Sequence, residues 1–135
     1  MHTISSLAKE ADLPIFTVRH YSRIGLLSPR FRASNGYRMF SDEDVRLLKF
    51  IHSAKELGFT LKEIGEIVEM ADHGDSPCPL VRDIIGRRIE ETERRVSKLR
   101  ALLSKMKKAQ ADWEETRDSL PTGHSVCRLI ENFAD

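Results

Sequence analysis

Apolar residues recur every three or four positions along most of the chain, first in short segments and then in one long segment. The segment 3–10 has an apolar face and begins at Thr3, a favourable N-cap residue. A second amphipathic segment begins near Pro14, which the first turn of a helix tolerates, and it loosens at Gly25. Ile24 is expected on its buried face. The two segments predict a helix-turn-helix.

The next stretch changes from helical spacing to two short extended pieces, 30–33 and 37–40. Ser34, Asn35 and Gly36 join them, and Asn-Gly between extended pieces is a strong signal for a β-hairpin.

Two more amphipathic helices are predicted after the hairpin, at 41–58 and 61–70. Each begins with Ser or Thr followed three places later by an acidic residue, the spacing of a capping box. The pairs are Ser41 with Asp44 and Thr60 with Glu63. Leu57 is expected to face inward, and Gly58 to end the first helix. The following loop, rich in Gly, Pro and Asp, predicts a hinge.

The longest amphipathic segment runs from Cys78 to Leu120. Its apolar or small residues step alternately by four and three, which is a heptad pattern. About 40 helical residues extend about 60 Å, and no second segment of that length is present to cover the apolar stripe. The pattern therefore predicts a homodimer paired through this helix. The predicted interface residues are Ile85, Ile89, Val96, Leu99, Leu103, Met106 and Trp113.

These elements predict a mainly α protein with a winged helix-turn-helix head, a helix pair and a long dimerisation helix. A short amphipathic segment at the C-terminus is expected to turn Val126 and Ile130 inward. The predicted domains are the head at 1–72, a hinge at 73–78, the dimerisation helix at 79–120 and a C-terminal effector-binding loop with a short helix at 121–135.

Charge is distributed unevenly along the 135 residues, although the formal net charge is only +1. Residues 1–40 contain six basic and two acidic side chains, and residues 109–135 contain two basic and six acidic ones. The first part suits a polyanion and the last part suits cations. No apolar run of membrane length and no signal peptide is found, so we expect a cytoplasmic protein whose two cysteines are reduced.

Short polar and basic side chains on the outer face of the second helix suit a DNA major groove, and the basic hairpin suits the phosphate backbone beside it. The predicted DNA-binding residues are Thr17, Arg19, His20, Tyr21, Arg23, Arg30, Arg32, Tyr37 and Arg38. No nucleophile with a base at workable spacing, no phosphate loop and no suitable carboxylate pair is present, which argues against an enzyme.

Two stretches carry a resemblance to the MerR family of transcriptional regulators. ISSLAKEADLPIFTVRHYSRIGLLSP resembles the family's helix-turn-helix, and NGYRMFSDEDVRLLKFIHSAKELGFTLKEI resembles its wing and second helix pair. The resemblance implies an antiparallel dimer on a pseudo-palindromic promoter operator, which activates RNA polymerase holoenzyme by distorting the DNA. Where many members have Arg-Tyr-Tyr-Glu, this chain has Arg19-His20-Tyr21-Ser22.

Cys78 opens the long helix, where the helix dipole favours a thiolate. In the metal-sensing branch of the family, a cysteine at this place resembles the mark of sensors for divalent ions. The resemblance implies that Cys78 binds metal together with the partner's C-terminal loop, which contains His124 and Cys127. Such sensors usually have another cysteine at the end of the long helix, where this chain has Trp113.

The remaining ligand set of two sulfurs and one nitrogen suits Zn²⁺ or a similar borderline ion. Water, Asp118 or Glu115 would complete it, and His73 is a candidate ligand for a second ion. Cd²⁺, Pb²⁺, Co²⁺ and Hg²⁺ are alternative ions for this site. The alternative function is a regulator of the same fold that senses an oxidant or an organic electrophile through Cys78 and Cys127.

Overall fold

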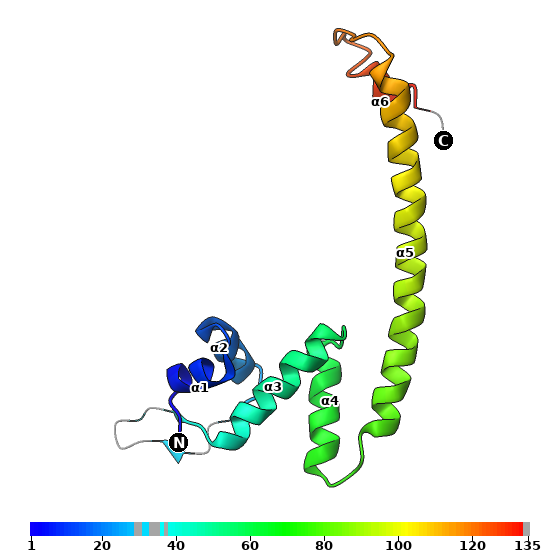
Figure 1. Cartoon of the computed structure of the whole chain (residues 1–135). Helices are drawn as coiled ribbons and strands as arrows, with labels where there is room; N and C mark the ends of the chain where they lie inside the picture. The colour runs from blue at the N-terminus through cyan, green and yellow to red at the C-terminus, as the bar shows by residue number, and fades with distance from the viewer. Residues whose placement is uncertain (29–30, 33–35, 37, 134–135) are drawn as a thin grey trace. The chain divides into compact units, whose positions relative to one another are not determined.

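The structure, a computed structural model, describes residues 1–28, 31–32, 36 and 38–133. These residues form six helices and a two-stranded sheet (Figure 1). The chain divides into two compact units, Met1–Arg88 and Ile89–Asp135, which are described separately below. The predicted fold class, mainly helical with a helix-turn-helix head and a long C-terminal helix, is confirmed.

The helix-turn-helix consists of α1 (Ile4–Ala11) and α2 (Ile15–Arg23). Thr3 caps α1 as predicted, because its side chain accepts a hydrogen bond from the Ser6 amide at 3.2 Å. Asp12 ends α1 in the left-handed conformation, with φ of 56°. Pro14 is the N-cap of α2, so its missing N–H leaves no helical hydrogen bond unmade.

The hairpin is a short antiparallel pair, β1 (Phe31–Arg32) and β2 (Arg38–Met39). Its second strand is tied to the N-terminus, because His2 and Phe40 exchange two backbone hydrogen bonds of 2.7 Å each. Of the residues predicted for the wing, Arg30 and Tyr37 lie outside the described residues. The predicted turn at Ser34 and Asn35 also lies outside them.

The predicted helix pair is formed by α3 (Asp42–Glu56) and α4 (Leu61–Asp72), and both predicted capping boxes are present. Gly58 has φ of 90° between the two helices, a conformation that glycine adopts without strain. The prediction that Leu57 faces inward is wrong. It is the C-cap of α3 and is 62% exposed, because the helix ends before its side chain can turn back to the core.

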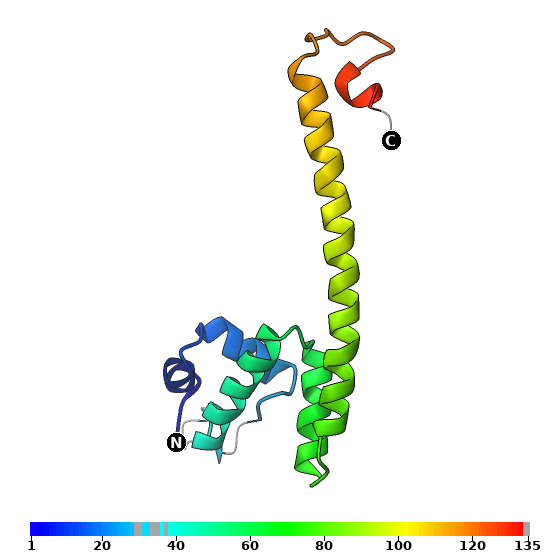
Figure 2. The same cartoon turned by 45° about the vertical axis from the view of Figure 1, so that its right-hand side comes forward.

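One apolar core joins the elements of the first unit, with side chains from the helix-turn-helix, the wing and the helix pair. The fully buried side chains are Leu7, Val18, Leu27, Phe40, Leu48, Ile51, Ile64 and Ile84. Ile84 comes from the first turns of the long helix α5, and Figure 2 shows these turns beside α4. The first compact unit, Met1–Arg88, therefore includes the first turns of α5. The predicted domain boundary at residue 72 stays a prediction.

An ion pair adds to this packing at the end of the first unit. The Arg88 guanidinium lies 2.6 Å from Glu63 Oε2, and the Arg88 stem packs 3.5 Å from the position that a Cβ on Gly58 would occupy. The Thr60 amide donates to the same carboxylate at 2.9 Å. These hydrogen bonds, that of Thr60 first, hold the pKa of Glu63 below its ordinary value.

The long helix α5 spans Cys78–Glu114, so it ends before the predicted Leu120. The Thr116 hydroxyl donates to the Asp112 carbonyl at 2.8 Å, and the Thr116 amide donates to Trp113. Such a local hydrogen bond competes with the helical pattern and closes the last turn. A short helix, α6 (Arg128–Glu131), follows. No helix in the described ranges has both the length and the apolar character needed to span a membrane.

Candidate DNA-binding face and effector-binding segment

The outer face of α2 carries exposed basic side chains. Arg19, His20 and Arg23 are exposed, as the helical pattern predicted. A surface pocket of about 390 Å³ lies on this face, and its lining residues are Ile4, Phe16, Arg19, Arg23 and Arg38. Three guanidinium groups around one hollow make a strongly positive surface, which suits phosphate oxygens or the acceptor edge of guanine.

The second strand of the wing is linked to the recognition helix through Arg38. Its Nη1 donates to Ser22 Oγ at 3.3 Å, across 16 positions of sequence. Ser22 is one of the positions at which the chain departs from the motif that it resembles, and its hydroxyl accepts the hydrogen bond from Arg38. This departure thus contacts Arg38, one of the arginines that line the pocket.

Two predicted DNA-binding residues of α2, Tyr21 and Thr17, are less exposed than the arginines of this face. Tyr21 is only 8% exposed and belongs to the apolar core, with its ring 6.1 Å from that of His20. Thr17 is half-buried. Because Tyr21 is buried and Thr17 is half-buried, the exposed polar face of α2 is narrower than the sequence indicated. The strand position of Arg32 is described, and it pairs with Arg38.

Sequence reasoning missed Phe16 as a member of this face. It is 70% exposed and lines the pocket with the three arginines. The sequence did contain a signal for this. Phe16 directly precedes Thr17, a predicted DNA-binding residue, and it falls outside the apolar stripe of α2, so its side chain could be expected on the outer face. The prediction that Ile24 lies on the buried face of the second helix is wrong. The helix α2 ends at Arg23, and the Ile24 side chain is 47% exposed.

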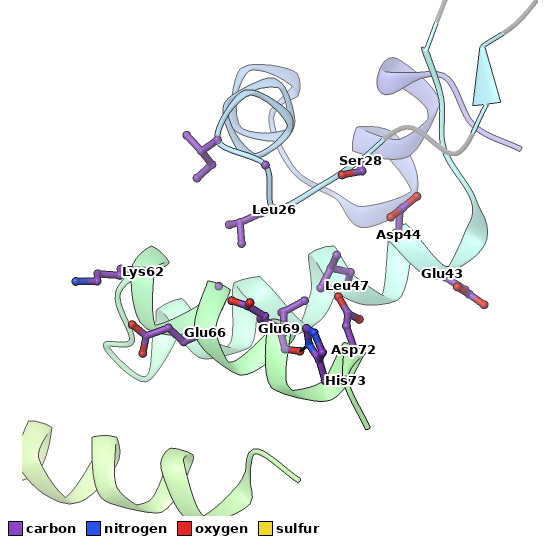
Figure 3. A pocket seen from close by; sticks show the side chains of 14 residues that line it. Leu26, Ser28, Glu43, Asp44, Leu47, Lys62, Glu66, Glu69, Asp72 and His73 are labelled. Atoms are coloured by element: carbon purple, nitrogen blue, oxygen red, sulfur yellow. Dashed lines mark hydrogen bonds between the residues drawn. The ribbon is translucent and has the colours of Figure 1, made fainter. Parts of the chain in front are cut away.

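A second hollow of the head, a groove of about 1080 Å³, has an acidic lining. Figure 3 shows Glu66, Glu69 and Asp72 along α4, with His73 next to them. His73 Nδ1 lies 2.8 Å from the Glu69 carbonyl oxygen, so this nitrogen carries the proton and donates. The role of His73 as a metal ligand stays a prediction.

Cys78 is the first residue of α5 and is exposed. Its amide donates to Ser76 Oγ at 3.4 Å, so the side chain of Ser76 faces the start of the helix. An exposed thiol at a helix start is accessible to a soft or borderline metal ion and to electrophiles.

Glu131 makes hydrogen bonds within the segment that contains the other two predicted ligands, His124 and Cys127. The Glu131 carboxylate accepts from Ser125 Oγ at 2.6 Å and from the Val126 amide at 3.2 Å, and these bonds lower the pKa of Glu131. Cys127 is half-buried as the N-cap of α6. His124 is exposed, and its amide donates to Thr122 Oγ1 at 3.1 Å.

The end of α5 forms a small cluster with the C-terminal segment. Trp113 is half-buried and meets Phe133 edge to face, with ring centroids 6.3 Å apart. Trp113 and Asp118 line a pocket of about 560 Å³. The expectation that Val126 and Ile130 turn inward is wrong for the single chain, because they are 83% and 68% exposed. The short α6 has too few residues to bury both.

Within the described part of one chain, no three His, Cys, Asp or Glu side chains gather as a metal site. Cys78 belongs to the first compact unit, whereas His124 and Cys127 belong to the second. The predicted site takes its ligands from two subunits, so a single chain does not test it.

Along α5, apolar side chains of the predicted heptad pattern remain exposed. The exposed members are Ile89, Val96, Leu99, Leu103 and Met106. Ile85 differs, because it packs against the core of the head. Trp113 is half-buried and packs against Phe133.

A winged helix-turn-helix with a positive face on its second helix defines a DNA-binding protein. Two family models match the chain: "MerR HTH family regulatory protein" over residues 2–71, and "MerR, DNA binding" over residues 45–109. The chain belongs to the MerR family of helix-turn-helix transcriptional regulators. It is a DNA-binding regulator and not an enzyme.

Similar proteins include the mercuric resistance operon regulatory protein of Bacillus cereus, 34% identical over 99 residues, which are 73% of this chain and 75% of that protein. The HTH-type transcriptional regulator ZntR of Escherichia coli K12 is 31% identical over 103 residues, 76% of this chain and 73% of ZntR. The crystal structure of PbrR691 from Ralstonia metallidurans CH34 in complex with lead(II) superposes with a TM-score of 0.78. It is 26% identical over 99% of this chain and 100% of the other.

Proposed function

We propose that this protein is a homodimeric, metal-responsive transcriptional activator. It binds a pseudo-palindromic promoter operator and, on binding a divalent metal ion, distorts the DNA so that RNA polymerase holoenzyme can use the promoter. Since it acts on promoters, the proposal places it in the cytoplasm. The observation that carries the DNA-binding part is the pocket where Arg19, Arg23 and Arg38 converge.

The exposed apolar residues of α5 support the homodimer. Leu99, Leu103 and Met106 are 63%, 51% and 56% exposed, and they share the heptad spacing of a helix that pairs with another helix. Burying one such side chain stabilises a complex by about 1.5–3 kcal/mol. A second copy of the helix offers the same stripe, as a symmetric dimer requires.

The donor set fits a borderline divalent ion. Two free cysteines and one histidine provide two sulfur ligands and one imidazole, a combination that Zn²⁺ accepts well. In the dimer, Cys78 of one subunit would hold the ion together with His124 and Cys127 of the other, and Asp118, Glu115 or water would complete the set. A bound ion would supply a link between the two subunits. The similarity to a mercuric resistance operon regulatory protein and to PbrR691 in complex with lead(II) supports the metal class and leaves the ion open.

The experiment that tests the metal site is a Zn²⁺ titration of the dimer, followed by Trp113 fluorescence and by elemental analysis. We expect stoichiometric zinc and a change in emission, because the single tryptophan lies in the same compact unit as His124 and Cys127. Cys78→Ser and His124→Ala should each lose the metal. The matched control is His52→Ala, which removes a histidine that pairs with Glu56 on α3, 3.2 Å away.

If the protein binds none of Zn²⁺, Cd²⁺, Pb²⁺, Co²⁺ and Hg²⁺, the proposed metal response is contradicted. A response to peroxide or an alkylating agent that requires Cys78 and Cys127, without bound metal, would instead support the electrophile sensor.

A further inference from the structure

We infer that Phe16 reads a thymine methyl group in the operator and so sets part of the sequence specificity. This inference rests on the proposed DNA binding and adds a residue and a base to it. Phe16 is the second residue of α2, and it lies on the pocket that also contains Arg19 and Arg38.

The exposure of Phe16 is the first observation. Its side chain is 70% exposed, and among the described residues it is the only aromatic one lining this pocket, together with three arginines and Ile4. Scattered apolar residues on a surface need no explanation, but this one shares a hollow with the positive charges that bind DNA in the proposal. A surface meant only for phosphates would gain nothing from a phenyl ring there.

The position of Phe16 decides which part of DNA it meets. In helix-turn-helix proteins the first residues of the recognition helix point at base edges in the major groove. Phe16 is the second residue of α2, and Arg19 follows one helical turn later on the same side. Arg23 lies a further turn along, toward the helix end.

The chemistry of the ring then selects the base. A phenyl group has no donor or acceptor, so it cannot pair with the polar edges of guanine, cytosine or adenine. The thymine C5 methyl group is the one apolar feature that the major groove displays. Contact with it removes apolar surface of both partners from water.

The spacing predicts where this thymine lies. Side chains three residues apart on a helix are about 5–6 Å apart, and successive bases on a strand rise about 3.4 Å. The thymine read by Phe16 should therefore lie about one or two base pairs from the base pair that Arg19 contacts.

The test uses the full-length protein and DNA sites selected by it from a random duplex pool. In the selected site, each thymine is replaced in turn by deoxyuridine, which removes only the methyl group. We expect one thymine per half-site at which wild-type affinity falls roughly fourfold, the change expected for one buried methyl group, and roughly fifteenfold when both half-sites are changed. Phe16→Ala should bind the thymine and uracil sites equally, and Phe16→Leu should keep the preference.

The matched control is Ile24→Ala, which shortens another exposed apolar residue, at the C-cap of α2 and outside the arginine pocket. It should keep the full methyl dependence. Selected sites with no methyl-dependent thymine, or a Phe16→Ala variant with unchanged dependence, would overturn the inference and leave the proposed function standing. If no DNA sequence is selected at all, both are overturned.

Discussion

At the scale of single residues, the proposed DNA-binding face contains a few arginines that come from different elements. Arg19 and Arg23 project from α2, and Arg38 reaches the same pocket from β2 through its hydrogen bond to Ser22. The pocket therefore combines the recognition helix with the wing. Loss of one arginine removes a charge from residues 1–40, which contain only two acidic side chains.

Arg19→Ala should weaken binding to the selected operator by about 1–3 kcal/mol, because a guanidinium on the recognition helix pairs with a base edge or a phosphate. The measurement is a binding titration at several salt concentrations. Arg94→Ala, which removes the same charge from an exposed position of α5, should change the affinity little. Equal affinity of wild type and Arg19→Ala at moderate salt would remove Arg19 from the interface.

A second residue-scale effect concerns Glu63, whose side chain is 19% exposed and whose pKa is lowered by Thr60 and Arg88. A carboxyl group with a lowered folded pKa stabilises the fold above its ordinary pKa of about 4.3, and this contribution disappears as pH falls through the folded value. Glu63→Gln should therefore cost about 1 kcal/mol at pH 7. The difference from wild type should shrink below about pH 4.

Urea unfolding at fixed protein concentration over this pH range measures that difference. Glu66→Gln, at an exposed position of the same helix, is the control and should show no comparable loss at pH 7. A Glu63→Gln deficit that stays constant down to pH 3 would mean that the charge does not contribute.

At the scale of elements, α5 has two roles along its length. Its first turns complete the core of the head through Ile84 and Arg88, and the later turns present exposed apolar residues. The same helix thus serves an intramolecular core and, in the proposal, an intermolecular interface. A substitution in the later turns should affect association without unfolding the head.

Leu99→Glu should dissociate the dimer. Two copies of the substitution lose about 4 kcal/mol of apolar burial, which is roughly a thousandfold in the dissociation constant. Sedimentation across a dilution series measures the change. Ala101→Glu adds the same charge two residues away, on the opposite face of the heptad pattern, and should leave the dimer intact. A wild-type monomer at micromolar concentration would remove the proposed interface.

At the scale of the whole molecule, the two compact units have different candidate chemistry. The first contains the proposed DNA-binding face and Cys78, and the second contains His124 and Cys127. A ligand shared between subunits could favour one arrangement of two DNA-bound heads over another, since a ligand shifts an equilibrium by its difference in affinity for the two states.

Chelation of the metal should therefore abolish promoter activation while DNA binding persists. The measurement compares run-off transcription with operator binding before and after chelation, and after Zn²⁺ is restored. Activation that survives chelation and requires an oxidant would point to the electrophile sensor. Loss of DNA binding on chelation would mean that the ion supports the fold and not the response.

Local sequence patterns determined the helices of this protein. Capping boxes at Ser41 and Thr60, the left-handed turn at Gly58 and the heptad spacing of α5 involve residues three or four positions apart, so they can be read directly from the chain. These patterns did not predict where α5 ends, because the Thr116 hydroxyl competes for the Asp112 carbonyl, which a helical amide would otherwise use.

Only the tertiary structure decided which side chains meet across long stretches of sequence. Arg88 reaches Glu63 across 25 positions, and His2 lies 2.6 Å from Asp42 across 40. The burial of Tyr21 and the exposure of Phe16 depend on how α2 packs on the core. The spacing of apolar residues within this nine-residue helix does not specify that packing. The sequence by itself determined the elements and the class of regulator, whereas the composition of the arginine-lined pocket depended on the folded arrangement of α1, α2 and β2.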